Sequence, residues 1–228
     1  MDKKIIALIP ARGGSKGIPK KNIRKFLELP LIVHSINYAL SCKFIDEIYV
    51  TTDNMEISQI AIDAGAKTID RPKKLALDES TTESAIEHAL DKLTNKPDTI
   101  VLLQPTSPMR PKNSLEDALE IYYNGRYDSL LSISPTHNFF WSIKDNIPTP
   151  NYDFMNRPRR QDIKDEDISY TENGSLYIFS YKHFNNTKNR LGGKIGYIIF
   201  PEEYSIEIDS EKDFLILEKY AKLKKNDK

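Results

Sequence analysis

The sequence IIALIPARGGSKGIPKKN, residues 5–22, joins an apolar run of strand length to a loop of small and basic residues. Glycines let a backbone approach a ligand closely, exposed N–H groups can face its oxygens, and cationic side chains neutralise its charge. The pattern therefore favours a buried strand that carries a polyphosphate-binding loop at its carboxyl end. It is not a P-loop, because Ile18 follows Gly17 where that motif needs lysine. A basic surface loop before a helix is the alternative that these residues leave open.

The composition indicates that any ligand electrostatics are local. The chain has 228 residues, enough for one α/β domain, with 33 basic and 33 acidic side chains. This balance gives no support to nucleic acid or an anionic membrane as a partner. The single cysteine, Cys42, excludes an internal disulfide and a cysteine-rich zinc site. No apolar stretch is long enough for a membrane span, and the first one is too short for a signal peptide, so we expect a cytoplasmic protein.

Apolar strands and amphipathic helices alternate over the first 135 residues. Continuous apolar centres, such as residues 100–103, are typical of parallel strands covered on both faces. The alternation predicts an α/β fold with a Rossmann-like, doubly wound, mostly parallel sheet, in which ligands bind beyond the carboxyl ends of the strands. The expected strands are 5–10, 47–53, 67–70, 98–104, 129–134, 175–179 and 194–200; the expected helices are 30–40, 54–64, 83–93, 113–124 and 214–223; a turn is expected near 185–190 and a frayed tail from 222.

Residues 137–168 break this alternation, being rich in proline, asparagine, arginine and aromatic residues without a helical period. About thirty irregular residues are too many for a passive loop in a compact domain. We therefore expect an extended or hairpin-like excursion from a single domain that covers residues 1–228. Such an excursion either lines a site or packs on a second subunit, which favours a homodimer.

Acidic residues near helix starts often serve as caps. Asp53 ends an expected strand, and we predict that it caps the helix that follows. Thr81 or Thr82 is expected to cap the helix over 83–93. These residues have a sufficient structural explanation without any ligand.

Glu207 and Asp209 lie two residues apart in an expected extended segment, so both carboxylates face one side and the neighbouring isoleucines the other. Adjacent carboxylates repel each other unless a cation lies between them, and Mg²⁺ is commonly held by one or two carboxylates plus substrate phosphates. The pair is therefore a candidate Mg²⁺ site. The alternative is a helix start with Asp209 as its N-cap.

Two polar segments could contact a small ligand. Residues 104–110, QPTSPMR, follow the most apolar strand and could hold a base or ribose, or could simply form a rigid turn. Residues 157–161 bring together three arginines, whose guanidinium groups match carboxylates and phosphates, although a solvated basic patch is as good an explanation. No histidine spacing supports a nucleophilic triad or a zinc hydrolase.

Taken together, the motifs resemble those of the cytidylyltransferases that activate eight- and nine-carbon acidic sugars, most closely the CMP-N-acylneuraminate synthetase family. The resemblance implies a fold of the nucleotide-diphospho-sugar transferase type. It also implies a reaction in which the anomeric hydroxyl of an acidic 2-keto sugar attacks the α-phosphate of CTP and pyrophosphate leaves, with Mg²⁺ as cofactor. The motifs span nearly the whole chain: the opening loop, Thr51-Thr52-Asp53, Arg71-Pro72, Leu75-Ala76, Asp78, residues 102–110, Asn173-Gly174-Ser175-Leu176-Tyr177-Ile178 and Ile206-Glu207-Ile208-Asp209.

The resemblance implies roles for individual residues. Arg12, Lys21 and Asp209 would be catalytic, and Glu207 and Asp209 would bind the metal. The residues expected to bind CTP are Ala11, Arg12, Gly13, Ser15, Lys16, Lys21, Asn22, Arg71, Thr81 and Thr82, and those expected to bind the sugar are Gln104, Arg160, Gln161 and Asn173. In similar enzymes the segment at 137–168 packs against the partner of a dimer and helps to close its sugar site.

Two residues depart from the family pattern. The family usually has aspartate at the position of Glu207, so Asp209 is the firmer metal ligand. Sialic acid enzymes usually have proline at the position of Glu172, which favours a sugar of the legionaminic acid type. The alternatives are the same chemistry on pseudaminic or 3-deoxy-octulosonic acid, or a non-catalytic nucleotide-binding oligomer.

Overall fold

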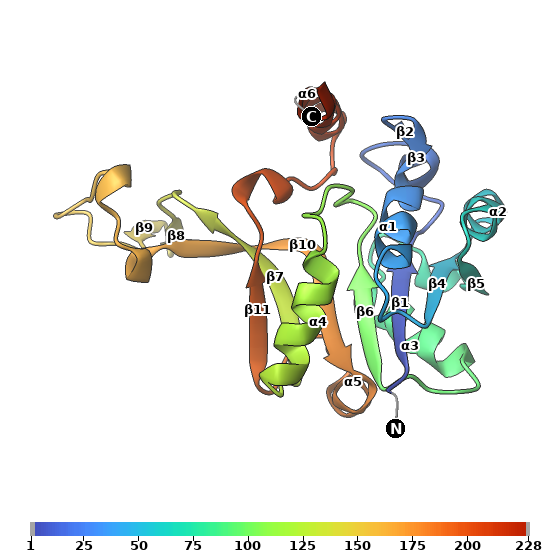
Figure 1. Ribbon diagram of the computed structural model, residues 1–228. Coiled ribbons are helices and arrows are strands. Elements are labelled where there is room, and N and C mark those ends of the chain that lie inside the picture. Colours follow the sequence, from blue (N-terminus) through green and yellow to red (C-terminus); the bar gives the residue numbers. More distant parts are fainter. Residues whose placement is uncertain (1–2, 227–228) are drawn as a thin grey trace.

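A seven-stranded sheet organises the structure (Figure 1), a computed structural model in which residues 3–226 are described. Its strands are β1 (Ile5–Pro10), β4 (Glu47–Thr52), β5 (Lys67–Asp70), β6 (Thr99–Leu103), β7 (Ser129–Thr136), β10 (Ser169–Ser180) and β11 (Ile195–Ile199). Their order across the sheet is β11-β7-β10-β6-β1-β4-β5. All neighbouring pairs are parallel except those of β10, which runs antiparallel to β6 and β7. The predicted doubly wound, mostly parallel sheet is confirmed.

Helices cover both faces of this sheet (Figure 1). They are α1 (Leu31–Leu40), α2 (Met55–Asp63), α3 (Thr82–Lys92), α4 (Ser114–Asn124), α5 (Tyr181–Thr187) and α6 (Glu211–Asn226). Ala7 and Ile9 of β1 pack under α1, α2 and α4, whereas Ile6 and Leu8 face α3 and α5. Because successive strand residues point to opposite faces, a strand between two helical layers must be apolar throughout. Helix α5 occupies part of the region where a turn was predicted, near residues 185–190.

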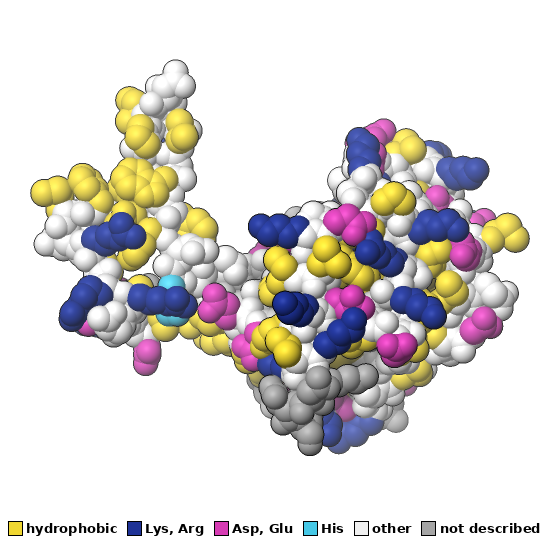
Figure 2. Space-filling view, turned by 90° about the horizontal axis from the view of Figure 1, so that it is seen from above, with side chains coloured by type: hydrophobic (Ala, Val, Ile, Leu, Met, Phe, Trp, Pro, Cys, Tyr) yellow, Lys and Arg dark blue, Asp and Glu magenta, His cyan; other side chains and the backbone are white. Residues whose placement is uncertain are grey.

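An arm formed by residues 137–168 leaves the sheet between β7 and β10. It contains a hairpin of β8 (Trp141–Lys144) and β9 (Ile147–Pro150), followed by two short 3-10 turns. The arm stands apart from the body in Figures 1 and 2, and hydrophobic side chains gather on it. Its exposed large apolar residues are Phe140, Trp141, Ile143, Ile147, Phe154 and Met155.

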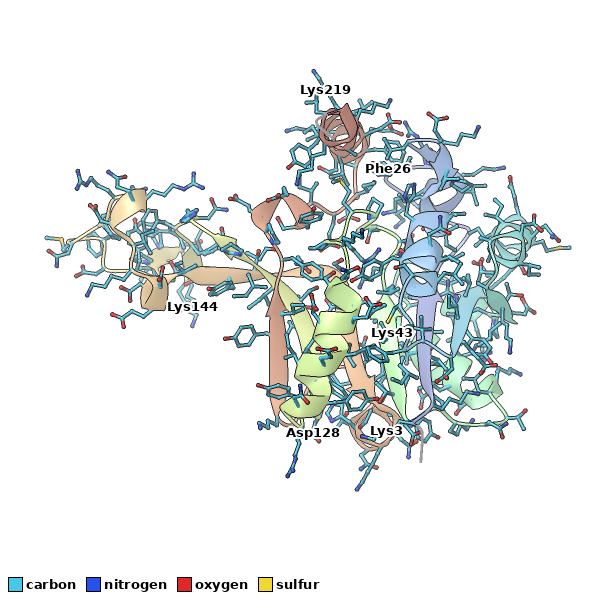
Figure 3. The ribbon with its side chains drawn as sticks, viewed as in Figure 1. Lys3, Phe26, Lys43, Asp128, Lys144 and Lys219 are labelled. Carbon is cyan, nitrogen blue, oxygen red and sulfur yellow. The ribbon has the colours of Figure 1, made fainter. Side chains whose placement is uncertain are left out.

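A third, smaller apolar cluster lies beyond the carboxyl ends of the parallel strands, between the opening loop and α6. Its buried members are Ile18, Phe26, Leu31, Ile208, Phe214, Leu217 and Ala221. Phe26 lies in the short strand β2 (Lys25–Phe26), which pairs with β3 (Leu29–Pro30), and its ring meets Phe214 edge-on at 5.9 Å between centroids. Figure 3 shows Phe26 on the side of the molecule that carries α6. This cluster attaches the last helix of the chain to the first loop.

The N-caps of α2 and α3, which start near the carboxyl edge of the sheet, were both predicted, and one of the two predictions is correct. The cap of α2 is Asn54, whose side chain accepts a 3.0 Å hydrogen bond from the backbone N–H of Ile57. The prediction that Asp53 caps this helix is wrong, because its carboxylate accepts a hydrogen bond from the backbone N–H of Gly13 instead. Helix α3 is capped by Thr81, whose hydroxyl accepts from the N–H of Ser84 at 3.1 Å, as predicted.

Helix α6 begins with reciprocal hydrogen bonds between Ser210 and Asp213. The Asp213 carboxylate accepts from the N–H of Ser210 at 2.8 Å, and the Ser210 hydroxyl accepts from the N–H of Asp213 at 3.3 Å, which is a capping box. Asp209 therefore precedes the cap instead of forming it. The helix continues through the tail expected to fray from residue 222, while residues 227–228 lie outside the described part. Between residues 3 and 226, no helix has the length and apolar character needed to cross a membrane.

Candidate active site

A cavity of about 430 Å³ opens at the carboxyl edge of the sheet, between the opening loop and the start of α3. Its walls come from the segments that follow β1, β5 and β6 and from the segment before α6, which are distant in sequence. Most of the predicted site residues line it: Arg12, Ser15, Lys16, Lys21, Asn22, Arg71, Thr81, Thr82, Gln104 and Asp209. Ala11 and Gly13 lie in the same opening loop without lining the cavity.

The opening loop is held by hydrogen bonds to its backbone. The N–H of Gly13 donates to the Asp53 carboxylate at 2.8 Å, and the side-chain amide of Asn22 donates to the carbonyl oxygen of Arg12 at 2.9 Å. A Cβ atom at Gly13 would come within 2.9 Å of Asn54, so a glycine is required for this close approach. These contacts hold the start of the loop, at Arg12 and Gly13, in place.

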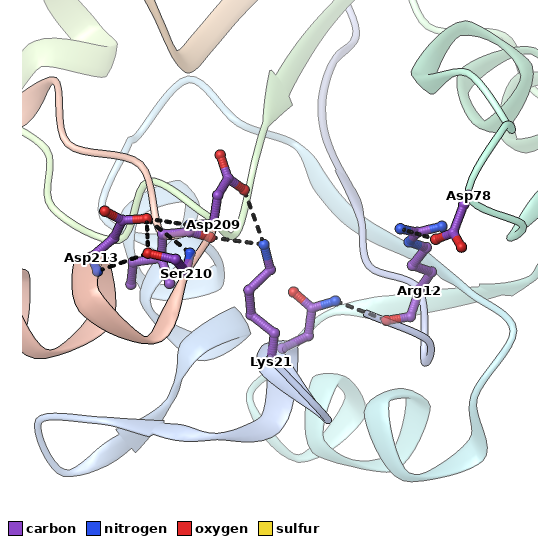
Figure 4. Close-up of polar contacts among 8 residues, drawn as sticks. Arg12, Lys21, Asp78, Asp209, Ser210 and Asp213 are labelled. Carbon is purple, nitrogen blue, oxygen red and sulfur yellow. Dashed lines mark hydrogen bonds and ion pairs between the residues drawn. The ribbon is translucent and has the colours of Figure 1, made fainter. Parts of the chain in front are cut away.

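Three basic side chains of the loop are paired with carboxylates at the cavity, and Figure 4 shows the pairs of Arg12 and Lys21. Arg12 and Lys16 lie 2.8 and 2.9 Å from the Asp78 carboxylate, and Lys21 lies 3.2 Å from that of Asp209. These pairs hold the cations around the cavity, and an anionic ligand could replace the carboxylates as their partner. Asp78 was identified from the sequence only as part of a motif, and no pattern in the sequence indicates that it is the counter-ion of two cations.

Arg71 has unused hydrogen-bonding capacity in the cavity wall. Its side chain is buried, yet Nε and Nη2 have no hydrogen-bond partner within the described residues. Burial lowers the pKa of this guanidinium, Asp53 raises it and Arg12 lowers it further. The hydroxyl of Thr106, which also lines the cavity, is likewise buried without a partner in the described chain. Because unpaired buried donors are costly, these groups favour a ligand that brings acceptors.

The two carboxylates of the predicted metal site have different environments. Asp209 lines the cavity with 71% of its side chain exposed, whereas Glu207 is largely enclosed beside Gly174. Burial, and then the charges of Asp209 and Glu172, raise the pKa of Glu207 to about 7, partly opposed by the charge of Lys21. Ile208 points the other way and is fully buried, as the predicted alternation requires. Of the two carboxylates, Asp209 is therefore the one that could bind a cation in the cavity.

The structure separates the four residues expected at the sugar. Gln104 lines the cavity. Asn173 is buried, and its amide is occupied by hydrogen bonds that include a 3.0 Å bond to the hydroxyl of Ser134. Arg160 and Gln161 lie on the arm and are exposed, outside the cavity of their own chain. Their role in binding a sugar stays a prediction.

Arg110 was a candidate for ligand contact, but its hydrogen bonds are to the protein. Its guanidinium donates to the carbonyl oxygens of Gln104 and Ser175 at 2.9 and 3.1 Å, and to the hydroxyl of Ser35 at 3.1 Å. Burial lowers its pKa to about 10, partly opposed by Tyr38. Arg110 thus joins the end of β6 to the middle of β10 and positions Gln104 at the cavity.

A basic, glycine-containing loop at the carboxyl edge of a mostly parallel sheet defines a nucleotide-binding α/β protein. The chain belongs to the cytidylyltransferase family, whose model matches residues 6–227. It is 31% identical over 215 residues to the N-acylneuraminate cytidylyltransferase of Escherichia coli O18:K1:H7, covering 94% of this chain and 51% of that protein. It is 36% identical over 219 residues to N-acylneuraminate cytidylyltransferase A of Danio rerio, covering 94% and 50%. The chain thus spans about half the length of these curated relatives.

Solved structures show the same fold. A CMP:2-keto-3-deoxy-manno-octonic acid synthetase complexed with CTP matches with a TM-score of 0.73 and 15% identity, over 97% of this chain and 99% of the other. A 4-diphosphocytidyl-2C-methyl-D-erythritol synthase from Anaerococcus prevotii matches with a TM-score of 0.69 and 13% identity, over 97% and 100%.

Proposed function

We propose that this protein transfers CMP from CTP to a nonulosonic acid, an N-acylneuraminate or a legionaminic-type sugar, and releases pyrophosphate. The observation that carries this proposal is the cavity in which Arg12, Lys16, Lys21 and the unpaired Arg71 converge. Family membership supports CTP as the nucleotide, and the names of the relatives support an N-acylated acidic sugar. Because CTP is a metabolite of the cytoplasm, we expect the reaction to take place there.

The residues of the cavity provide the two things that phosphoryl transfer needs, which are positioning and charge neutralisation. Arg12, Lys16 and Lys21 would hold the triphosphate, exchanging their present carboxylate partners for phosphate oxygens. The anomeric hydroxyl oxygen of the sugar then forms a bond to the α-phosphorus, and its proton passes to solvent water. The bond from the α-phosphorus to the oxygen that bridges the α- and β-phosphates breaks, and pyrophosphate leaves. The cations of the loop would neutralise the charge of this leaving group.

Mg²⁺ is part of the proposal, and the carboxylates fit it in part. Asp209 offers exposed oxygen atoms at the cavity, and Glu207 lies close enough for the two charges to interact. The described residues contain no group of three or more histidine, cysteine or acidic side chains that could hold a metal, so phosphate and water oxygens would complete the coordination. Bound there, Mg²⁺ would neutralise phosphate charge.

We further propose that the arm packs on a second copy of the chain and helps to close its sugar site. Exposed apolar side chains such as Trp141, Ile143 and Met155 favour burial against a partner. Arg160 and Gln161 lie on the arm, outside the cavity of their own chain, and would serve the neighbouring one. Sedimentation of the wild-type protein and of a double variant, Trp141→Ser with Ile143→Ser, tests this. A wild-type monomer would refute the dimer.

The function is tested by pyrophosphate release from CTP with a panel of acids: N-acetylneuraminic, legionaminic, pseudaminic and 3-deoxy-octulosonic acid. We expect turnover with a nonulosonic acid, and loss of turnover when EDTA removes Mg²⁺. Turnover with the eight-carbon acid alone would favour that alternative. Absence of release with every acid would favour a non-catalytic nucleotide-binding protein.

The role of Asp209 is tested by Asp209→Asn, which should reduce turnover at least about a hundredfold, the usual effect of removing a group that stabilises transition-state charge. The matched control is Glu211→Gln, because that nearby carboxylate pairs with Arg24 instead of lining the cavity. Near-normal turnover of Asp209→Asn would remove this residue from the site.

A further inference from the structure

Two cations of the opening loop share one carboxylate, that of Asp78. Arg12 Nη2 lies 2.8 Å from Asp78 Oδ1, and Lys16 Nζ lies 2.9 Å from Asp78 Oδ2, so each carboxylate oxygen has its own cation. Arg12 Nη1 also donates a long hydrogen bond, 3.5 Å, to the carbonyl oxygen of Ala76. Figure 4 shows the side chains of Arg12 and Asp78 pointing toward each other from separate segments. One acidic side chain thus occupies both cations at once.

Asp78 lies in the loop between β5 and α3, which forms one wall of the cavity. This loop is closed by hydrogen bonds of its own. The hydroxyl of Ser80 donates to the carbonyl oxygen of Lys74 at 3.3 Å and accepts from the backbone N–H of Leu77 at 3.1 Å. These local hydrogen bonds do not involve the Asp78 carboxylate, so they keep the loop in shape when its two ion pairs are broken.

The two ion pairs of Asp78 are accessible to solvent. The exposed fraction of the side chain is 40% for Asp78, 32% for Arg12 and 83% for Lys16. Ion pairs between exposed groups are weak, because water and salt screen the two charges. A carboxylate with this exposure is also readily hydrated when its partners leave. Exchange of Asp78 for another anion therefore has a small free-energy cost.

Asp78 and a phosphate group would compete for the same cations. The hydrogen bond from Lys16, and to a smaller extent the pairing with Arg12, lowers the pKa of the Asp78 carboxyl, so this group is an anion at neutral pH. A phosphate that binds Arg12 and Lys16 would lie beside the carboxylate and be repelled by it. The carboxylate and a phosphate group therefore exclude each other from these two cations.

We propose that Asp78 is an internal competitor of the phosphates, which occupies Arg12 and Lys16 before CTP binds and pairs with them again when pyrophosphate leaves. This inference rests on the proposed function and deepens it. Binding of CTP or of pyrophosphate must break two ion pairs, so the affinity for both ligands is lower than the cations alone would give. The return of the carboxylate supplies the cations with a partner as pyrophosphate departs. Asp78 thus favours release of the product over tight binding.

The test measures the binding of CTP and of inorganic pyrophosphate, each with Mg²⁺ and without sugar, by titration calorimetry. Asp78→Asn and Asp78→Ser remove the competing charge, so both Kd values should fall about fivefold, the factor expected for two exposed ion pairs. In turnover, inhibition by added pyrophosphate should strengthen by the same factor. A merely structural role of Asp78 predicts the opposite sign, which is weaker binding. Since the two substitutions differ in size and shape, a folding defect in one leaves the other as the test.

Glu79→Gln is the matched control, because it removes the same charge at the next position of the loop, while Arg12 and Lys16 pair with Asp78 instead. It should leave both Kd values within about twofold of wild type. Unchanged or weaker binding in the Asp78 variants, with normal binding by the wild type, overturns this inference alone. Equal strengthening in Glu79→Gln also overturns it, because the general charge of the loop would then explain the effect. A wild-type protein that binds neither CTP nor pyrophosphate refutes the proposed function together with this inference.

Discussion

The carboxylate of Asp53 accepts a 2.8 Å hydrogen bond from the backbone N–H of Gly13, which joins the end of β4 to the opening loop. The next residue, Asn54, caps α2, so adjacent side chains serve the loop and the helix separately. The order of these two residues therefore sets both the loop and the helix start.

Asp53→Ala should weaken CTP binding more than it weakens the fold. Loss of a hydrogen bond to a charged group, worth about 1.5 kcal/mol or more, should raise KM for CTP about tenfold. Ser180→Ala is the control, because it removes the cap of α5, a 3.0 Å bond to the N–H of His183, at the other edge of the sheet. This control should cost about 1 kcal/mol of stability with no effect on KM for CTP. Equal KM values for both variants would contradict the assigned role of Asp53.

Lys20 and Lys21 form a matched pair in the sequence with opposite environments. Lys21 lies 2.7 Å from the carbonyl oxygen of Ile208 and lines the cavity, while Lys20 pairs with Glu56 outside it. Lys21→Met should lower kcat/KM for CTP by about a hundredfold, since a positioned cation for the phosphates is lost. Lys20→Met should stay within about twofold. Steady-state kinetics at fixed Mg²⁺ checks both, and similar losses would show that only the general charge of the loop matters.

Two glycines of the same loop should respond differently to substitution by alanine. A Cβ atom at Gly17 would lie 2.4 Å from the carbonyl oxygen of Asp209, whereas one at Gly14 would meet no atom within 4 Å. Gly17→Ala should displace the segment that carries Asp209, with about 1–3 kcal/mol of destabilisation and a larger loss of turnover. Gly14→Ala should behave as wild type in urea unfolding and in turnover. Tolerance of Gly17→Ala would contradict the close packing of this loop against the final segment.

Glu47 should contribute to stability in acid. The hydrogen bond from Lys4, and then that from Lys67, lowers the pKa of Glu47 to about 2, against about 4.3 for glutamate in an unfolded chain. A lowered pKa gives stability that is present above pH ~4.3 and is lost as the pH falls toward ~2. Because the group is near the surface, the effect should be about 1 kcal/mol at most.

Urea unfolding between pH 6 and pH 2 tests this contribution. Glu47→Gln should remove part of the acid-dependent loss of stability over the window from about 4.3 to about 2. Glu218→Gln, which removes an exposed helix ion pair with Lys222, should leave the pH profile unchanged. Parallel profiles for wild type and Glu47→Gln would contradict the assigned pKa.

The order of strands and helices could be predicted because it depends on the pattern of apolar and polar residues within each short segment. A continuous apolar run such as 100–103 has few explanations other than a strand between two helical layers. Helix α5 was missed because its surface is rich in asparagine and lysine, which favour turns in isolation. Burial of Phe184 and capping by Ser180 decide its structure, and these depend on the folded sheet.

Residues of the candidate site could be predicted where they belong to a sequence motif. They could not be predicted where their role depends on contact between segments that are distant in the sequence. Asp53 and Asn54 are both good caps, and only the position of Gly13 assigns their roles. Arg190 and Glu83 meet across 107 positions of the chain, so no spacing could have paired them. Glu172, noticed as a departure from the family pattern, lies 3.9 Å from the Arg190 guanidinium group, a contact that no spacing in the sequence indicates either.

The small apolar cluster between the first loop and the last helix has a consequence for the synthesis of the protein. Lys21 and Asp209 are 188 positions apart, yet they face each other across the cavity. The ribosome synthesises the opening loop early, and the segment that packs against it, beyond residue 208, is added only near the end of synthesis. A growing chain therefore has the opening loop long before the carboxylate that completes the cavity. The cavity is complete only when the segment before α6 has packed against the opening loop.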